Sequence, residues 1–301
     1  MPTSPPLPTA RKDDQPASGQ ALSPLRAFLV YGSVPVGGIA VALLLGTCAL
    51  LGLRPSAPLV LLGFCGAFLV YQLDRSLWMG PEDRLNQPER VAWVRRHRRW
   101  IWTSSGLAVA TALFTLPFLQ PRTLAAGALL GGLGMLYGMP LPGGRRLKAF
   151  WPLKPLLIAA VWATGATVLP VIEAGLAVTS GVGALALYRF LFILPNALLA
   201  DGPDVEGDRR AGLRTAATEF SPEALRGLAA LSLGLAIGGA LVAVWFLGAS
   251  PLLYVDLGGP VLLLGFLWHR PGGARWFYGF VLDAVIAWPA LTALVDLLIP
   301  S

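Results

Sequence analysis

The feature that most constrains this chain is a series of apolar stretches close to the roughly 20 residues that a helix needs to cross a bilayer. They lack the period-2 alternation of membrane strands and are rich in Gly, Ala and Leu, so each is predicted to be a helix. Nine stretches are predicted: Ala27–Leu51, Ala57–Leu73, Trp100–Leu119, Leu124–Met139, Leu156–Ile172, Gly181–Ala200, Leu225–Leu247, Leu252–Trp268 and Trp276–Ile299.

The composition excludes a soluble fold. Only 13% of the 301 residues are charged and 55% are hydrophobic, whereas a soluble domain has about 25% charged residues. We therefore predict an all-α polytopic membrane protein with nine transmembrane helices. Residues 1–23 are polar and proline-rich, which predicts a disordered cytoplasmic tail, and residues 24–301 form the membrane domain.

The basic residues predict the topology. With a cytoplasmic amino terminus, 20 of the 23 Lys and Arg residues fall in cytoplasmic segments, and only Arg54 and Arg122 fall outside. Arg189 lies within the sixth span. This asymmetry predicts an integral, multi-pass protein of a bacterial-type inner membrane, with the carboxyl terminus outside. It also explains the net charge of +7 without nucleic-acid binding.

The strongest acidic cluster follows the sixth stretch and comprises Asp201, Asp204 and Asp208. On a regular helix these offsets fall within about 60° of one face. Carboxylates so close together repel unless a cation lies between them, and Mg²⁺ commonly bridges carboxylates to phosphate. The cluster is therefore interpreted as a magnesium site, the alternative being a solvated acidic loop.

A second acidic cluster, Asp74 and Asp83, follows the second stretch on the same side of the membrane. Gly80-Pro81 lies between them and can break the helix, so that both turn towards one point. Nearby cations are candidates for binding the phosphate oxygens of a polyanion, although membrane topology alone would also place them here. They are Arg75, Arg90, Arg145, Lys148, Arg209 and Arg214.

Three segments resemble the UbiA-type intramembrane prenyltransferases. Asp201–Thr215 is similar to the second Asp-rich motif of that family, Tyr137–Lys148 to its Tyr-x-x-Pro…Lys segment, and Asn86–Arg90 to the Asn-x-Pro-x-Arg that follows the first motif. The resemblance implies nine helices around a central cavity, with Mg²⁺ bound by Asp74, Asp83, Asp201, Asp204 and Asp208.

The first motif departs from the family's Asn-x-x-x-Asp-x-x-x-Asp. If Asp74 is its middle position, Val70 replaces the Asn and Trp78 replaces the last Asp. Asp83 supplies the last Asp only if about five residues are inserted. The departure indicates a divergent subfamily with an unusual donor or acceptor.

The resemblance implies transfer of an isoprenyl group from a polyprenyl diphosphate to an aromatic or other lipophilic acceptor, with release of pyrophosphate, among membrane lipids. A terpene cyclase of the same fold is the first alternative. A transporter is the second, because Arg189 and Asp283 are ionisable groups within predicted spans, which are usually functional.

Overall fold

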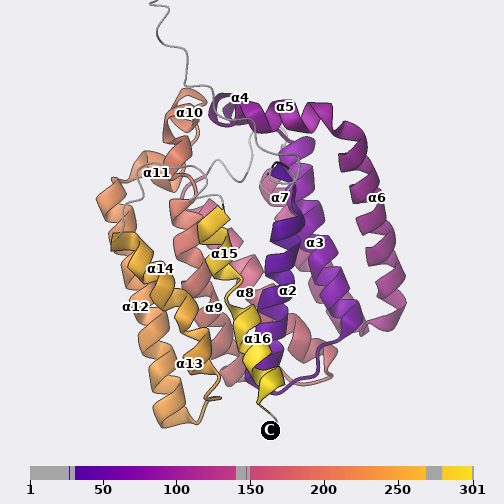
Figure 1. Cartoon of the computed structure of the whole chain (residues 1–301), viewed down its shortest axis with the longest axis vertical. Helices are drawn as coiled ribbons and strands as arrows, with labels where there is room; N and C mark the ends of the chain where they lie inside the picture. Colours follow the sequence, from indigo (N-terminus) through magenta and orange to yellow (C-terminus); the bar gives the residue numbers. More distant parts are fainter. Residues whose placement is uncertain (1–26, 28–30, 140–146, 148–149, 269–279, 300–301) are drawn as a thin grey trace, which may run out of the picture.

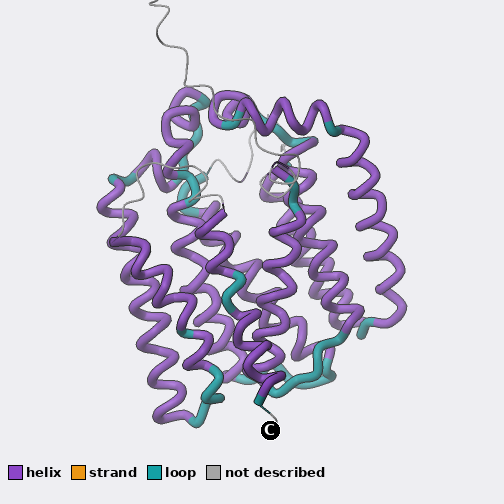
Figure 2. Tube along the Cα trace, in the orientation of Figure 1, coloured by secondary structure: helices purple, strands orange, loops and turns teal. Residues whose placement is uncertain are grey.

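The computed structural model describes residues 27, 31–139, 147, 150–268 and 280–299. Across these residues every regular element is a helix (Figures 1 and 2), which confirms the all-α prediction. The predicted tail, Arg145 and Lys148 lie outside the described residues.

Six helices are long and apolar enough to cross a membrane. They are α2 (Val34–Leu51), α3 (Ala57–Ser76), α6 with the 3₁₀ turn η1 (Arg98–Thr115, Leu116–Phe118), α8 (Leu153–Glu173), α9 with its continuation (Ser180–Leu199, then to Arg210) and α12 (Pro222–Leu247). All six coincide with predicted stretches, and the chain is a multi-pass membrane protein. The exact count of nine crossings stays a prediction.

The other three predicted stretches are less regular. The helix α7 (Pro121–Gly138) is 18 residues long but is not among these six. Leu252–Trp268 forms α13 (Leu253–Asp256) and α14 (Gly258–Trp268), and the described part of Trp276–Ile299 forms α15 (Leu282–Ile286) and α16 (Pro289–Leu298). The eighth predicted span is thus interrupted at one residue, Leu257, which keeps helical dihedrals, and the described part of the ninth is interrupted at Ala287 and Trp288.

The two interruptions pack against each other. A Cβ atom at Gly258 would lie 2.3 Å from the Trp288 ring, so only glycine fits there. The ring nitrogen of Trp288 donates a hydrogen bond to the Val255 carbonyl at 2.8 Å. Pro289 begins α16 and cannot supply a backbone N–H to continue α15. The breaks are thus fixed by local residue choice and by their mutual contact.

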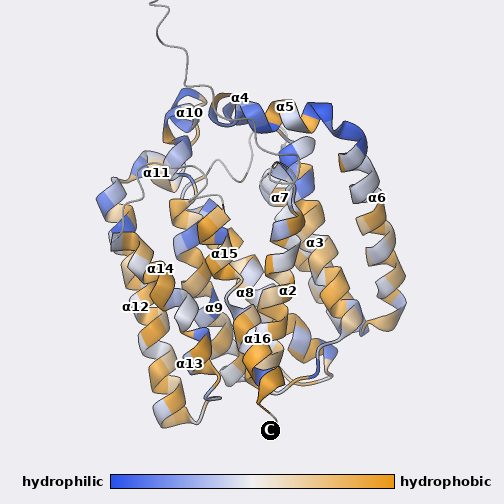
Figure 3. Ribbon diagram, in the orientation of Figure 1, coloured by the Kyte–Doolittle hydropathy of each residue, from blue (hydrophilic) through white to orange (hydrophobic). Residues whose placement is uncertain are grey.

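The core lies where α9 meets α2, α8, α12, α14 and α15, with Phe192 and Leu233 fully buried. The outer faces of α6 and α12 expose large apolar side chains, among them Phe114 and Trp245. The ribbon of α12 is coloured mostly as hydrophobic in Figure 3. An apolar outer surface is suited to lipid and not to water.

Four shorter helices gather at one end of the bundle: α4 (Pro81–Asn86), α5 (Pro88–Arg96), α10 (Val205–Arg210) and α11 (Ala216–Glu219). The carboxyl terminus lies at the other end (Figure 1). Hydrophilic residues concentrate on α4, α5 and α10 (Figure 3). Both predicted acidic clusters therefore belong to the same polar end of the molecule.

Candidate active site

The first acidic segment contains the predicted helix break. The helix α3 ends at Ser76 and α4 begins at Pro81. Asp83 caps the new helix, because its Oδ2 accepts a hydrogen bond from the Gly80 backbone N–H at 2.8 Å. Its Oδ1 pairs with Arg90 at 2.5 Å. Asp83 and Arg90 therefore form an ion pair at the start of α4.

Asp74 and Arg75 face different neighbours. A Cβ at Gly138 of α7 would lie 2.7 Å from Asp74 Oδ1, so Asp74 lies against that helix. Arg75 donates from Nη1 to the Gly32 carbonyl at 3.1 Å and lies 5.6 Å from the Tyr71 ring centroid. The guanidinium is therefore directed towards the start of α2.

Val70 and Trp78, the two departures from the family pattern, pack against α7. A Cβ at Gly134 would lie 3.4 Å from Val70, and one at Gly138 would lie 3.1 Å from Trp78. Val70 and Asp74 lie four residues apart on one face of α3, and Trp78 follows just after the end of that helix. The two replacements serve as contacts with the glycines of α7.

The second acidic segment is not the single regular helix that the spacing assumed. The helix α9 ends at Leu199, a 3₁₀ turn η3 (Gly202–Asp204) follows, and α10 begins at Val205. Asp201 and Asp208 are buried, and Asp204 is half-buried. The turn arises where Pro203, which lacks an N–H, interrupts the α-helical hydrogen bonds. Asp201, Asp204 and Asp208 therefore lie within one short helical segment, but not on a single regular α-helix.

The two acidic segments contact each other through amide side chains. Asn86 donates from Nδ2 to Asp208 Oδ1 at 2.9 Å, and Gln87 donates from Nε2 to Asp204 Oδ2 at 3.2 Å. A Cβ at Gly207 would lie 1.8 Å from Asn86 Oδ1, so the close approach of α10 to α4 requires glycine. Residues from the second and sixth predicted loops thus meet at one site.

Lys154 is a site residue that the sequence reasoning missed. It lies in the first turn of α8 and forms an ion pair with Asp201 Oδ1. Asp201 Oδ2 is buried and has no hydrogen-bond partner among the described residues. A single Lys at the entrance of an apolar stretch was available as a signal, but topology explained it equally well.

The other two predicted cations that the structure describes, Arg209 and Arg214, lie towards solvent. Arg209 is exposed. Arg214 is also exposed and makes two 2.9 Å hydrogen bonds to Glu219, which lower the pKa of the Glu219 carboxyl. Of the six predicted diphosphate-binding cations, Arg75 and Arg90 are thus the described ones held close to the acidic segments.

In the part of the chain that is described, no three His, Cys, Asp or Glu side chains converge as a metal site. This does not conflict with magnesium bound to a phosphate, because Mg²⁺ in such sites typically uses one or two carboxylates, with water and phosphate oxygens as its other ligands. The acidic side chains are therefore suited to a magnesium site in which phosphate oxygens of a bound ligand supply the remaining contacts to the ion.

The two charges considered for transport do not pair with each other. Arg189 is fully buried and pairs with Asp256, from Nη1 to Oδ2 at 2.5 Å and from Nη2 to Oδ1 at 3.1 Å. Asp256 also accepts hydrogen bonds from Tyr188 and Thr292. Asp283 instead accepts one from Asn196 at 2.9 Å.

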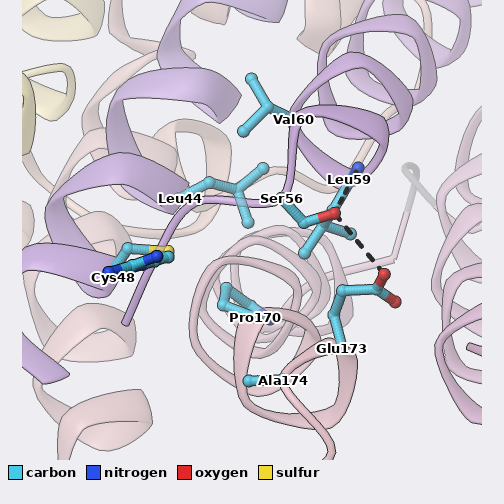
Figure 4. Close-up of a pocket in the computed structure, with 9 residues that line it drawn as sticks. Leu44, Cys48, Ser56, Leu59, Val60, Pro170, Glu173 and Ala174 are labelled. Carbon is cyan, nitrogen blue, oxygen red and sulfur yellow. Dashed lines mark hydrogen bonds between the residues drawn. The ribbon is translucent and has the colours of Figure 1, made fainter. Parts of the chain in front are cut away.

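Two cavities lie at different levels of the bundle. One of about 290 Å³ is bordered by Arg75, Asp283, Phe280 and the start of α2. A smaller one of about 100 Å³ lies where α2, α3 and α8 end or begin; there Ser56 and Glu173 share a 3.5 Å hydrogen bond (Figure 4). The larger cavity includes Arg75 of the first acidic segment and is the one that adjoins the candidate site.

Comparison with known proteins identifies the fold. No family model and no curated protein matches the sequence. A UbiA homologue from Archaeoglobus fulgidus, solved with GPP and Mg²⁺, is 17% identical, with a TM-score of 0.63 over 91% of this chain and 100% of that one. The chain has the UbiA fold.

Two further structures support the UbiA fold. An apo UbiA homologue from Aeropyrum pernix K1 gives a TM-score of 0.64 at 14% identity, covering 87% of this chain and 98% of its own. A digeranylgeranylglyceryl phosphate synthase gives 0.57 at 14% identity, covering 90% and 98%. The UbiA fold thus extends over most of the chain.

Proposed function

We propose that this protein is an intramembrane prenyltransferase of the UbiA type. It transfers an isoprenyl group from a polyprenyl diphosphate to a lipophilic, aromatic acceptor and releases pyrophosphate. The observation that carries the proposal is the contact between the two acidic segments, made by Asn86 with Asp208 and by Gln87 with Asp204. The UbiA fold, and the GPP and Mg²⁺ bound by one protein that shares it, support the proposal.

The acidic side chains fit Mg²⁺. Asp201 presents a buried carboxylate oxygen that has no hydrogen-bond partner among the described residues, and such an oxygen is a ligand that Mg²⁺ prefers. Asp201, Asp204 and Asp208 are the candidates for one ion, which one or two of them would bind directly, and Asp74 and Asp83 are the candidates for a second. Bound there, Mg²⁺ would neutralise the negative charge of a diphosphate.

Basic side chains of the protein would bind the same diphosphate directly. Lys154 already lies beside Asp201. Arg75 and Arg90 flank the first segment, and guanidinium groups match phosphate oxygens in geometry. Their positive charge stabilises pyrophosphate as the allylic C–O bond breaks. Arg145, Lys148, Arg209 and Arg214 are further candidates.

The apolar surroundings protect the allylic cation from water until the acceptor attacks it. The cavity beside Arg75 has apolar walls from Val36, Ile39 and Phe280. We propose that the acidic end faces the cytoplasm with the amino terminus, because the Arg-rich α5 lies there.

The test uses the full-length protein in detergent, with GPP, Mg²⁺ and a panel of phenolic acceptors. Pyrophosphate release is expected, with a loss of at least about 100-fold in Asp201→Asn or Asp208→Asn and loss on removal of Mg²⁺ with EDTA. Glu206→Gln is the matched control, because Glu206 is an exposed carboxylate on the same helix. Equal activity in all four proteins would refute the proposal, and a cyclic product formed without acceptor would identify a terpene cyclase.

A further inference from the structure

The cavity bordered by Asp283 has the character of a small-molecule pocket. Its walls are mainly apolar and come from α2 and α15, and its charged lining residues are Arg75 and Asp283. Binding pockets for small molecules are typically apolar, with a few polar groups that orient the ligand. At about 290 Å³ the cavity is near the lower limit of such pockets, which is suited to one ring system and not to a long isoprenyl chain.

Asp283 is held by Asn196 at the side of this cavity. An ionised carboxylate can only accept hydrogen bonds, so the 2.9 Å contact to Asp283 Oδ1 is donated by Asn196 Nδ2. The other atom of the amide, Asn196 Oδ1, is buried and has no partner among the described residues. Asp283 Oδ2 likewise makes no hydrogen bond within the described part of the chain. Two acceptor atoms therefore lack a donor.

The Asn196–Asp283 pair lies near the residues proposed to bind the diphosphate. Asn196 lies on α9 five residues before Asp201, which corresponds to about 7.5 Å along a helix. Arg75, which also lines the cavity, follows Asp74 directly. The cavity therefore extends from the first acidic segment to a carboxylate that would repel a diphosphate. Its Asp283 side is suited to the acceptor, not to the donor's phosphates.

We propose that Asp283, oriented by Asn196, is a specificity-determining residue that accepts a hydrogen bond from a hydroxyl or amino group of the acceptor. This rests on the proposed function, since it assigns the acceptor's place in that reaction. The substrate class is then a neutral ring with a hydroxyl or amino donor. A ring without such a donor is disfavoured, because it leaves Asp283 without a hydrogen-bond partner.

The experiment measures binding without turnover. Isothermal titration calorimetry compares 1-naphthol, 1-methoxynaphthalene and naphthalene, added to the full-length protein in detergent with Mg²⁺ and no donor. The wild type is expected to bind 1-naphthol at least about tenfold more tightly than the other two, because a site built around an acceptor rejects ligands without the matching donor. Equal affinities in the wild type would overturn the proposal.

Variants localise the effect. Asp283→Asn replaces an acceptor with an amide of the same shape, so the preference for 1-naphthol over 1-methoxynaphthalene is expected to fall close to one. The affinity for GPP should not change. Asp296→Asn, at an exposed carboxylate on α16, is the matched control and should keep the preference. If Asp283→Asn does not fold, Ala284→Phe, which fills the cavity without touching the hydrogen bond, should abolish binding of 1-naphthol.

The outcomes separate this inference from the proposed function. If GPP is turned over while Asp283→Asn or Ala284→Phe retains the full preference for 1-naphthol, the assignment of Asp283 is wrong and the prenyltransferase proposal stands. If no GPP is turned over but the preference depends on Asp283, the prenyltransferase proposal fails and the cavity stays a binding site for hydroxylated rings.

Discussion

Asn86 on α4 donates a hydrogen bond to Asp208 on α10, a residue 122 positions further along the chain. Asn86 and Asp208 are both buried. The bond connects the loop after α3 to the loop after α9, and with it the two groups of carboxylates that would share one anion.

Replacing Asn86 with Ala should weaken this connection. The change leaves Asp208 without its hydrogen-bond donor, and a buried acceptor without a partner costs about 1–3 kcal/mol. We expect the free energy of unfolding in detergent to fall by that amount and GPP turnover to fall at least about tenfold. Thermal unfolding and pyrophosphate release are the measurements, and an unchanged variant would show that the contact is dispensable.

Gly207→Ala should separate α4 from α10. The added methyl group would lie 1.8 Å from Asn86 Oδ1, so the Asn86 side chain or one of the two helices must move. Turnover should fall at least about tenfold, because misplacement by an ångström is costly to catalysis. Gly234→Ala in α12 is the matched control: its Cβ meets nothing within 4 Å, and alanine favours the helix by about 1 kcal/mol. Equal activities of the two variants would contradict the prediction.

Lys154→Met should lower the stability of the protein and raise its KM for GPP. It leaves the buried Asp201 carboxylate without its cation, which in other proteins costs about 3–5 kcal/mol, with a smaller cost expected at this partly exposed pair. It also removes positive charge from the proposed diphosphate site, so the KM for GPP should rise. Lys154→Arg should restore part of both properties. A variant with wild-type KM would remove Lys154 from the site.

Arg189 and Asp256 should behave as a structural pair. Arg189→Met alone leaves a fully buried carboxylate and should destabilise the protein by about 3–5 kcal/mol. Arg189→Met combined with Asp256→Leu should recover most of that loss, because apolar replacement of both partners is often neutral. GPP turnover by the folded double variant should be close to wild type. Substrate flux in proteoliposomes that depends on Arg189 would instead favour a transporter.

The sequence predicted the parts of the structure that depend on local composition. Apolar stretches predicted the helices, and Gly80-Pro81 predicted the break between α3 and α4. Because the sequence has few acidic residues, the clustering of Asp201, Asp204 and Asp208 could be recognised. Tertiary contacts were not predictable, because a single sequence does not say that Asn86 meets Asp208 or that Lys154 meets Asp201. The pairing of Arg189 with Asp256 was missed for the same reason.

The regularity of helices was also overestimated. A mean hydropathy does not register that Gly258 admits the Trp288 ring, or that Pro289 begins a new helix. These features depend on the shape of a neighbour that is distant in sequence. The two interrupted spans near the carboxyl terminus were therefore predicted as apolar segments but not as broken helices.

That junction has a consequence for biosynthesis. Gly258 and Gly259 leave a hollow that the Trp288 ring fills, and the ring's N–H reaches the Val255 carbonyl. Trp288 follows α13 and α14 in the chain, so these helices emerge from the ribosome ahead of the side chain that completes them. Their final packing requires the segment that contains Trp288, so the two interrupted helices reach their final packing together and late in synthesis.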